Sequence, residues 1–264
     1  MRGTLIVNPS SGGSDAADAV IRAARERGVA VHVLDDGEDP GEAARSAGDG
    51  PLGMAGGDGS LAAVAGVALE REVPFVVVPL GTRNHFARDV GLDRDDPVAA
   101  LDAFDGDEQR IDVARAGERL FLNNASLGVY ARLVHHRERH RRRRDALARA
   151  RALALAVAHR HETAFTVDGD AVVTRAMLVA NNHYDLTLFN LGARQRLDTG
   201  ELHLYIAHGL LPQTWEERTG GAFTLDTSRH RAVVALDGEP AALTTPLEFR
   251  SEPGALRLLL PPGA

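Results

Sequence analysis

The spacing of hydrophobic residues changes about 110 residues into the chain. Before that point, short apolar runs, typical of buried strands, alternate with longer segments of helical periodicity. The runs predict strands at Leu5–Val7, Val29–Leu34, a short segment ending at Ala55, and Pro74–Leu80. The periodic segments predict helices at Ser14–Gly28, Pro40–Gly48, Ser60–Glu72, Asn84–Gly91 and Asp96–Phe104. This alternation favours a parallel sheet with helices on both faces.

The second half consists mainly of strand-like runs separated by turn residues. These runs cover 111–117, 119–128, 163–170, 172–182, 201–209, 231–240 and 255–260. Such a series predicts an antiparallel sandwich or barrel, which is interrupted only by a helical insertion at about 133–159. The predicted fold class is therefore α/β plus all-β, with an α/β domain at 1–113 and a β domain at 114–264.

Composition excludes several classes of protein. The 264 residues are 44% hydrophobic and contain no cysteine, which excludes disulfides and thiolate metal sites. A net charge of −7 argues against general nucleic-acid binding. All basic residues are arginine, so a lysine-bearing phosphate loop is excluded. The chain shows no signal-peptide pattern and no apolar run near the roughly 20 residues that span a bilayer, so we expect a cytoplasmic protein with at most peripheral membrane contact.

Three glycine-rich polar loops follow three of the predicted strands. They are Asn8–Gly13, Gly56–Ser60 and Gly81–Asn84. Each one alone fits a tight turn or a helix cap. In a parallel sheet, however, such loops meet at the carboxyl edge, where glycines and helix N-termini can bind phosphate. Together they predict a nucleotide site, in which the carboxylate of Asp58 would serve a metal ion or a proton.

Five motifs occur in the order and spacing of a known family. They are NPSSGG, GGDGS, PLGTRNHFARDVGL, FLNNASLG and LDGEP. In these motifs the chain resembles the diacylglycerol kinase catalytic family, which includes bacterial lipid kinases and sphingosine kinases and has NAD kinases as distant relatives. The resemblance implies an α/β nucleotide-binding domain, a β-sandwich lipid-binding domain, and an active site between them. It also implies ATP and Mg²⁺ as cofactors.

The resemblance further implies roles for single residues. Asp58 would lie at the γ-phosphate of ATP, and Glu239 would take the proton from a lipid hydroxyl. Asp112 would be a supporting acid. From the residues alone, Asp237-Gly238-Glu239 also fits a plain hairpin turn. The implied nucleotide-binding residues are Asn8, Pro9, Ser11, Gly12, Gly56, Gly57, Gly59, Ser60, Gly81, Thr82 and Asn84.

Two positions depart from the family pattern. His85, a candidate supporting residue, stands where the family often has aspartate, which would alter an acidic network. The family's structural magnesium segment retains Asp198 as a candidate ligand but has Thr199 in place of a second aspartate. Magnesium carried by the nucleotide is a separate matter.

Two further features bear on the acceptor. Arg137, Arg139 and Arg141–Arg144 form a dense basic run next to an apolar segment. Such a run is often only a solvated helix face, but on an acidic chain it also suits peripheral docking on anionic lipid. His183 is expected on the lipid side, with an ordinary loop histidine as the alternative.

The motifs favour an ATP-dependent lipid kinase that phosphorylates a diacylglycerol-like hydroxyl. One alternative is a kinase for a sphingoid-like lipid or a small metabolite. Another is a catalytically weak lipid- or nucleotide-binding regulator, suggested by His85 and Thr199. The presence of both Asp58 and Glu239 favours an enzyme.

Overall fold

The chain forms two compact units in the computed structural model, which describes residues 2–81, 84–128, 162–185, 193–208 and 215–263. The first, which we call the α/β unit, comprises Met1–Val113 and Pro253–Ala264. The second, the β unit, comprises Ala114–Glu252. Thr82, the expected insertion at 133–159 and the arginine run lie outside the described residues.

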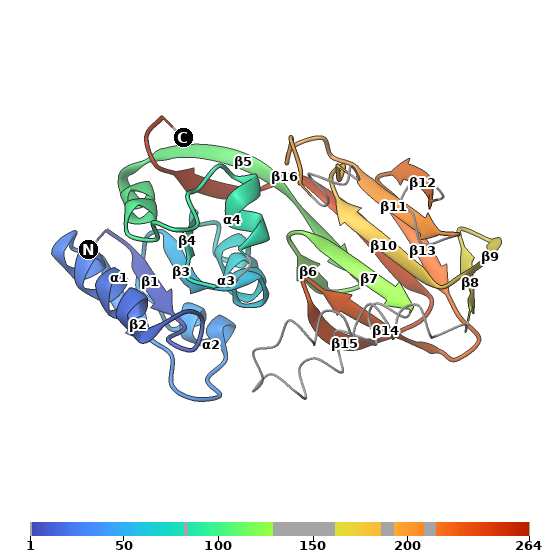
Figure 1. Ribbon diagram of the computed structural model, residues 1–264, viewed down its shortest axis with the longest axis horizontal. Helices are drawn as coiled ribbons and strands as arrows, with labels where there is room; N and C mark the ends of the chain where they lie inside the picture. Colours follow the sequence, from blue (N-terminus) through green and yellow to red (C-terminus); the bar gives the residue numbers. More distant parts are fainter. Residues whose placement is uncertain (1, 82–83, 129–161, 186–192, 209–214, 264) are drawn as a thin grey trace. The chain divides into compact units, whose positions relative to one another are not determined.

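A parallel sheet forms the centre of the α/β unit (Figure 1). Its order is β2 (Ala30–Val33), β1 (Thr4–Val7), β3 (Leu52–Gly56), β4 (Phe75–Pro79) and the end of β16 (Leu247–Leu260). All neighbouring pairs in this order are parallel. Every residue of β3 and β4 is buried, so both faces of the sheet are covered, as is usual for parallel sheets.

Two groups of helices accompany this sheet. α1 (Ser14–Glu26) packs with the 3₁₀ helix η1 (Ala99–Asp105), whereas α2 (Pro40–Arg45) packs with α3 (Asp58–Glu70). α4 (His85–Asp89) directly follows the loop after β4. α2 begins where the side chain of Asp39 accepts a 3.0 Å hydrogen bond from the Glu42 N–H, a typical N-cap. The predicted α/β arrangement is confirmed, although the segment expected as a helix at 96–104 contains a 3₁₀ helix.

The β unit consists of two antiparallel sheets. One has the order β12 (Trp215–Gly220), β11 (Leu202–Ala207), β10 (Ala176–Asn181), β7 (Asn124–Gly128), β14 (Arg231–Leu236) and β15 (Glu239–Thr244). The other joins the start of β16 to β13 (Ala222–Asp226), β8 (Thr163–Val167) and β9 (Asp170–Thr174). β5 (Asp107–Ala116) pairs with β6 (Arg119–Phe121) and with β16. Buried residues from both sheets, including Leu127, Ile206, Phe223 and Phe249, form one core. The predicted all-β sandwich is confirmed.

The carboxyl end differs from the expectation. The sequence placed all of 114–264 in the second domain, whereas Pro253–Ala264 belongs to the α/β unit. The physical reason is the pairing of Leu258 and Leu259 with β4, which extends the parallel sheet by one strand. Within the described ranges, no helix is both long and apolar enough to cross a membrane.

Candidate active site

The three glycine-rich loops lie at one edge of the parallel sheet. β1 pairs with β3, and β3 pairs with β4, all in parallel. Asn8 therefore leaves β1, Gly57 leaves β3 and Leu80 leaves β4 on the same side. The side chains and backbone of these loops are in direct contact.

Asn8 connects the first loop to the second. Its Nδ2 lies 3.4 Å from the hydroxyl oxygen of Ser60, in the first turn of α3. Its Oδ1 accepts a 3.0 Å hydrogen bond from the Ser10 N–H, which fixes the turn after β1. Both amide atoms of Asn8 thus shape the loops. Gly12 completes this loop against β4, because a Cβ there would collide with the carbonyl oxygen of Leu80.

The second and third loops touch through glycine and aspartate. A Cβ on Gly81 would lie 2.8 Å from the Cα of Gly57, so no larger residue fits without a backbone shift. The carboxylate of Asp58 accepts hydrogen bonds from the backbone N–H groups of His85 and Phe86, each 3.1 Å long. The side chain of His85 is exposed. Asp58 binds the backbone at position 85, so the departure from the family pattern leaves this contact in place.

Asn84 is turned into its own loop. It is 2% exposed and has φ 43 and ψ 50, in the left-handed region that asparagine tolerates better than most residues. Its Oδ1 accepts from the Gly81 N–H at 3.1 Å, and its Nδ2 donates to the Gly81 carbonyl at 2.6 Å. The side chain of Asn84 therefore braces the loop, a role that the motif alone did not indicate.

The start of α3 is suited to an anion. Gly57 is its N-cap and, having no side chain, makes no side-chain cap hydrogen bond to the first turn. The 13-residue helix also directs the positive end of its dipole here. Gly56 and Gly59 flank this turn, and Pro9 and Ser11 line the first loop. This arrangement can bind a phosphate, and a divalent cation on that phosphate would offset the charge of Asp58.

Glu239 begins β15 in the β unit and is exposed. It follows a two-residue turn in which Asp237 has φ 48 and Gly238 has φ 88. Leu236 pairs with Glu239 across this turn, which is the geometry of a type I′ hairpin. The hairpin alternative is therefore correct for the backbone. Asp237 in this turn also makes hydrogen bonds outside the hairpin.

The carboxylate of Asp237 binds three consecutive backbone N–H groups. Oδ2 accepts from Leu122 at 2.7 Å, and Oδ1 accepts from Asn123 and Asn124 at 2.8 and 3.0 Å. The turn that presents Glu239 is thereby fixed to the segment between β6 and β7. Asp237 was not among the predicted site residues, although the motifs FLNNASLG and LDGEP contain both halves of this contact.

Asp112 is buried and binds the backbone of β16. It is 2% exposed, and its Oδ1 accepts a 2.8 Å hydrogen bond from the Gly254 N–H. Gly254 has φ 57, so Asp112 supports the backbone of β16 at an unusual conformation. Its expected role as a supporting acid stays a prediction.

The structural magnesium site does not fit the residues present. Asp198 accepts a 2.9 Å hydrogen bond from Arg196 Nε, which lowers the pKa of the aspartate below its usual value. The hydroxyl of Thr199 donates to Asn182 Oδ1 at 2.6 Å. Among the described residues, no group of three or more His, Asp or Glu side chains is placed to hold a metal. We therefore assign no function to a metal at this segment.

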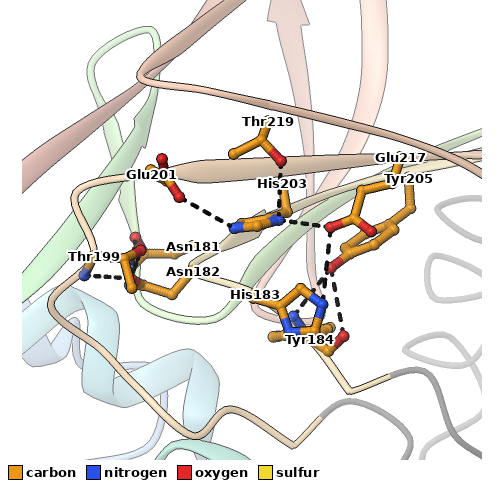
Figure 2. A network of polar contacts seen from close by, with 10 residues as sticks. All are labelled: Asn181, Asn182, His183, Tyr184, Thr199, Glu201, His203, Tyr205, Glu217 and Thr219. Atoms are coloured by element: carbon orange, nitrogen blue, oxygen red, sulfur yellow. Dashed lines mark hydrogen bonds and ion pairs between the residues drawn. The ribbon is translucent and has the colours of Figure 1, made fainter.

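His183 belongs to a polar network in the β unit (Figure 2). It lies 3.9 Å from the carboxylate of Glu217, which is also 2.7 Å from Nδ1 of the buried His203. Tyr205 accepts a 3.1 Å hydrogen bond from the Tyr184 N–H, and burial raises the pKa of this tyrosine. The contact with Glu217 fits an ordinary loop histidine, and the expected position of His183 on the lipid side stays a prediction. His183 also lines a hollow of ≈ 450 Å³ together with Asp185, Arg196 and Thr199.

Comparison with known proteins identifies the α/β unit. Residues 2–116 match the family described as the diacylglycerol kinase catalytic domain. This part of the chain is similar to that family. The expected resemblance is thus confirmed, and the matched residues include all three loops that meet at the sheet edge.

Individual relatives agree with this assignment. A Pseudomonas aeruginosa protein named "Probable lipid kinase YegS-like" is 38% identical over 132 residues, which are 47% of this chain and 43% of the relative. A Chromohalobacter salexigens protein of the same name is 30% identical over 140 residues, covering 50% and 45%. The chain thus spans less than half the length of these two relatives. A diacylglycerol kinase crystal structure from Bacillus anthracis has a TM-score of 0.71 at 16% identity, covering 97% of this chain and 96% of that one, which confirms the fold alone.

Proposed function

We propose that this chain is an ATP-dependent lipid kinase, which transfers the γ-phosphate to a lipid hydroxyl, diacylglycerol-like in the first instance. The observation that carries the proposal is the meeting of three glycine-rich loops at the N-terminus of α3. Asn8, Asp58 and Gly81 each contact a neighbouring loop there. This geometry supports a polyphosphate site, and the family match supports a kinase that uses it.

In the proposed reaction, the acceptor oxygen forms a bond to the γ-phosphorus as the bond to the β-γ bridging oxygen breaks. ADP leaves, and the carboxylate of Glu239 takes the hydroxyl proton. Mg²⁺ on the nucleotide would neutralise the developing charge, and the carboxylate of Asp58 is a candidate partner for it in the protein. Positioning and charge neutralisation account for most of the rate in such transfers.

Mg-ATP is expected to bind the α/β unit and to raise the unfolding temperature of the protein. The stabilisation should reach about 2.7 kcal/mol at a ligand concentration 100 times the dissociation constant. Calorimetry and thermal-shift titration with ATP, ADP and AMP measure this directly. AMP is the control, because it lacks the β- and γ-phosphates that the loops would bind. The kinase proposal fails if no nucleotide changes the unfolding temperature in the presence of magnesium.

The acceptor class separates the remaining alternatives. Labelled ATP offered with diacylglycerol, a sphingoid base, NAD and small polyols would label one class of product. If a soluble metabolite is labelled instead, the acceptor is that metabolite and not a lipid. Nucleotide binding without any labelled product would favour a regulator. The hydrogen bonds of Asp198 with Arg196 and of Thr199 with Asn182, at the segment where the family binds its structural magnesium, would agree with that outcome.

Peripheral docking on anionic membranes is also part of this proposal. The arginines at 137, 139 and 141–144 would each contribute about 1 kcal/mol to binding at an anionic surface. Sedimentation with phosphatidylserine vesicles should show binding that weakens as salt rises, because the Debye length falls from about 10 Å at 0.1 M. A variant with these arginines changed to glutamine should stay in the supernatant. Equal binding of this variant and the wild type would remove the docking role.

A further inference from the structure

A buried arginine contacts the segment that holds the Glu239 turn. Arg194 is 5% exposed, and burial of a guanidinium costs free energy unless hydrogen bonds compensate for lost water. Its Nη1 donates to the carbonyl oxygens of Leu122 at 2.7 Å and Asn181 at 3.1 Å. Its Nη2 donates to Asn123 Oδ1 at 2.6 Å. Arg194 thus joins the end of β10 to the segment between β6 and β7.

The same segment binds Asp237 through its N–H donors, whereas it binds Arg194 through its oxygen acceptors. The N–H groups of Leu122 and Asn123 donate to the carboxylate of Asp237, while the Leu122 carbonyl and the Asn123 side chain accept from Arg194. A cation and an anion therefore act on the two sides of one short stretch of backbone. Such aligned hydrogen bonds polarise one another and make the arrangement stiffer than either contact alone.

The side chains of Asn181 and Tyr184 add to the contacts around residues 122–124. Asn181 donates through its Nδ2 to the Leu122 carbonyl at 3.1 Å. The guanidinium carbon of Arg194 lies 5.8 Å from the ring centre of Tyr184, within cation–π range. The hydroxyl of Tyr184 accepts a 2.8 Å hydrogen bond from Asn124 Nδ2. All these contacts converge on residues 122–124.

We propose that Arg194 is a positioning residue for Glu239, acting through residues 122–124 and the carboxylate of Asp237. This inference rests on the proposed kinase function, in which Glu239 is the base. The guanidinium is required because its planar fork donates to three oxygens at fixed angles, which a lysine ammonium does not reproduce. Loss of the fork would let the Asp237–Gly238 turn shift, and a displacement near 1 Å costs about 10²-fold in rate.

The experiment compares four proteins: wild type, Arg194→Lys, Glu239→Gln and the double variant. Arg194→Lys should lower the single-turnover rate about 10²-fold and leave Mg-ATP affinity unchanged. In the Glu239→Gln background it should cause no further loss, because a residue that acts only through Glu239 has nothing left to position. Losses that multiply in the double variant would overturn the proposal, since Arg194 would then act by another route. Arg231→Lys, an exposed arginine on β14, is the matched control.

A second readout needs no activity. Amide hydrogen exchange at Leu122, Asn123 and Asn124 should become about tenfold faster or more in Arg194→Lys, as expected when hydrogen bonds to charged groups weaken. Unchanged exchange would overturn the proposal. If wild type transfers no phosphate, the kinase function falls, and exchange alone decides whether Arg194 holds this segment. Should Arg194→Lys fail to fold, Asn123→Ala removes one acceptor of the guanidinium and should change exchange and rate in the same direction.

Discussion

Glu239→Gln is expected to lower the single-turnover rate of phosphoryl transfer by about 10²- to 10⁴-fold, the usual contribution of a general base. Glutamine keeps the shape of the side chain but does not take a proton from the acceptor hydroxyl. Mg-ATP affinity should stay near the wild-type value, because Glu239 belongs to the β unit, whereas the three glycine-rich loops belong to the α/β unit. Rapid-quench transfer from labelled ATP and calorimetric titration measure the two quantities separately.

The matched control for this variant is Glu248→Gln. Glu248 is another exposed glutamate on a strand of the β unit, and its carboxylate is 4.0 Å from Arg250. We expect its rate and nucleotide affinity to match those of wild type. If Glu239→Gln also transfers phosphate at the wild-type rate, Asp237-Gly238-Glu239 is only a turn and Asp58 is left as the candidate base.

Three strands of the α/β unit, β1, β3 and β4, could be predicted because they are buried on both faces. β1 and β4 are buried at every position, so they are visible in the sequence as unbroken apolar runs. β12 gave no such signal, because every residue of WEERTG is half-buried or exposed and none is fully buried. The parallel pairing of Leu258 with Phe75 joins residues far apart in the chain, and no local pattern indicates it.

The candidate site was partly predictable for a similar reason. Loops that follow neighbouring parallel strands must meet at one edge, so the grouping of Asn8, Asp58 and Gly81 follows from the strand order. The side-chain directions do not follow. Asn84 turns back onto Gly81 because its backbone is left-handed, and the motif does not encode that choice.

Long-range polar contacts were the main omission. Asp237 binds Leu122 across 115 residues, and Arg194 binds the same residue across 72. No periodicity or motif spacing in the sequence relates residues so far apart. The burial of the Arg194 side chain therefore became evident only in the structure. The Gly254 N–H donates to Asp112 across 142 residues in the same way. The expected role of Asp112 as a supporting acid stays a prediction.

Asp58→Asn is expected to reduce both turnover and nucleotide binding. The carboxylate of Asp58 accepts from the N–H groups of His85 and Phe86, and the single amide oxygen of asparagine is a weaker acceptor for both. The start of α4 would lose this contact with α3, and the negative charge available to a nucleotide-bound Mg²⁺ would disappear. We expect the single-turnover rate to fall by about 10²-fold or more and Mg-ATP affinity to fall by about tenfold, equivalent to about 1.4 kcal/mol.

Asp39→Asn provides a matched control, because Asp39 also accepts a backbone hydrogen bond at the start of a helix, from Glu42 in α2. This substitution should change stability little, because asparagine caps a helix about as well as aspartate, and it should leave transfer unchanged. Thermal unfolding of both variants separates stability from function. If Asp39→Asn and Asp58→Asn change stability to the same extent and only Asp58→Asn loses transfer, Asp58 is assigned to the phosphate site. Equal transfer by Asp58→Asn and wild type would instead reduce Asp58 to a cap for α4, and the charge of the GGDG loop would have no part in the reaction.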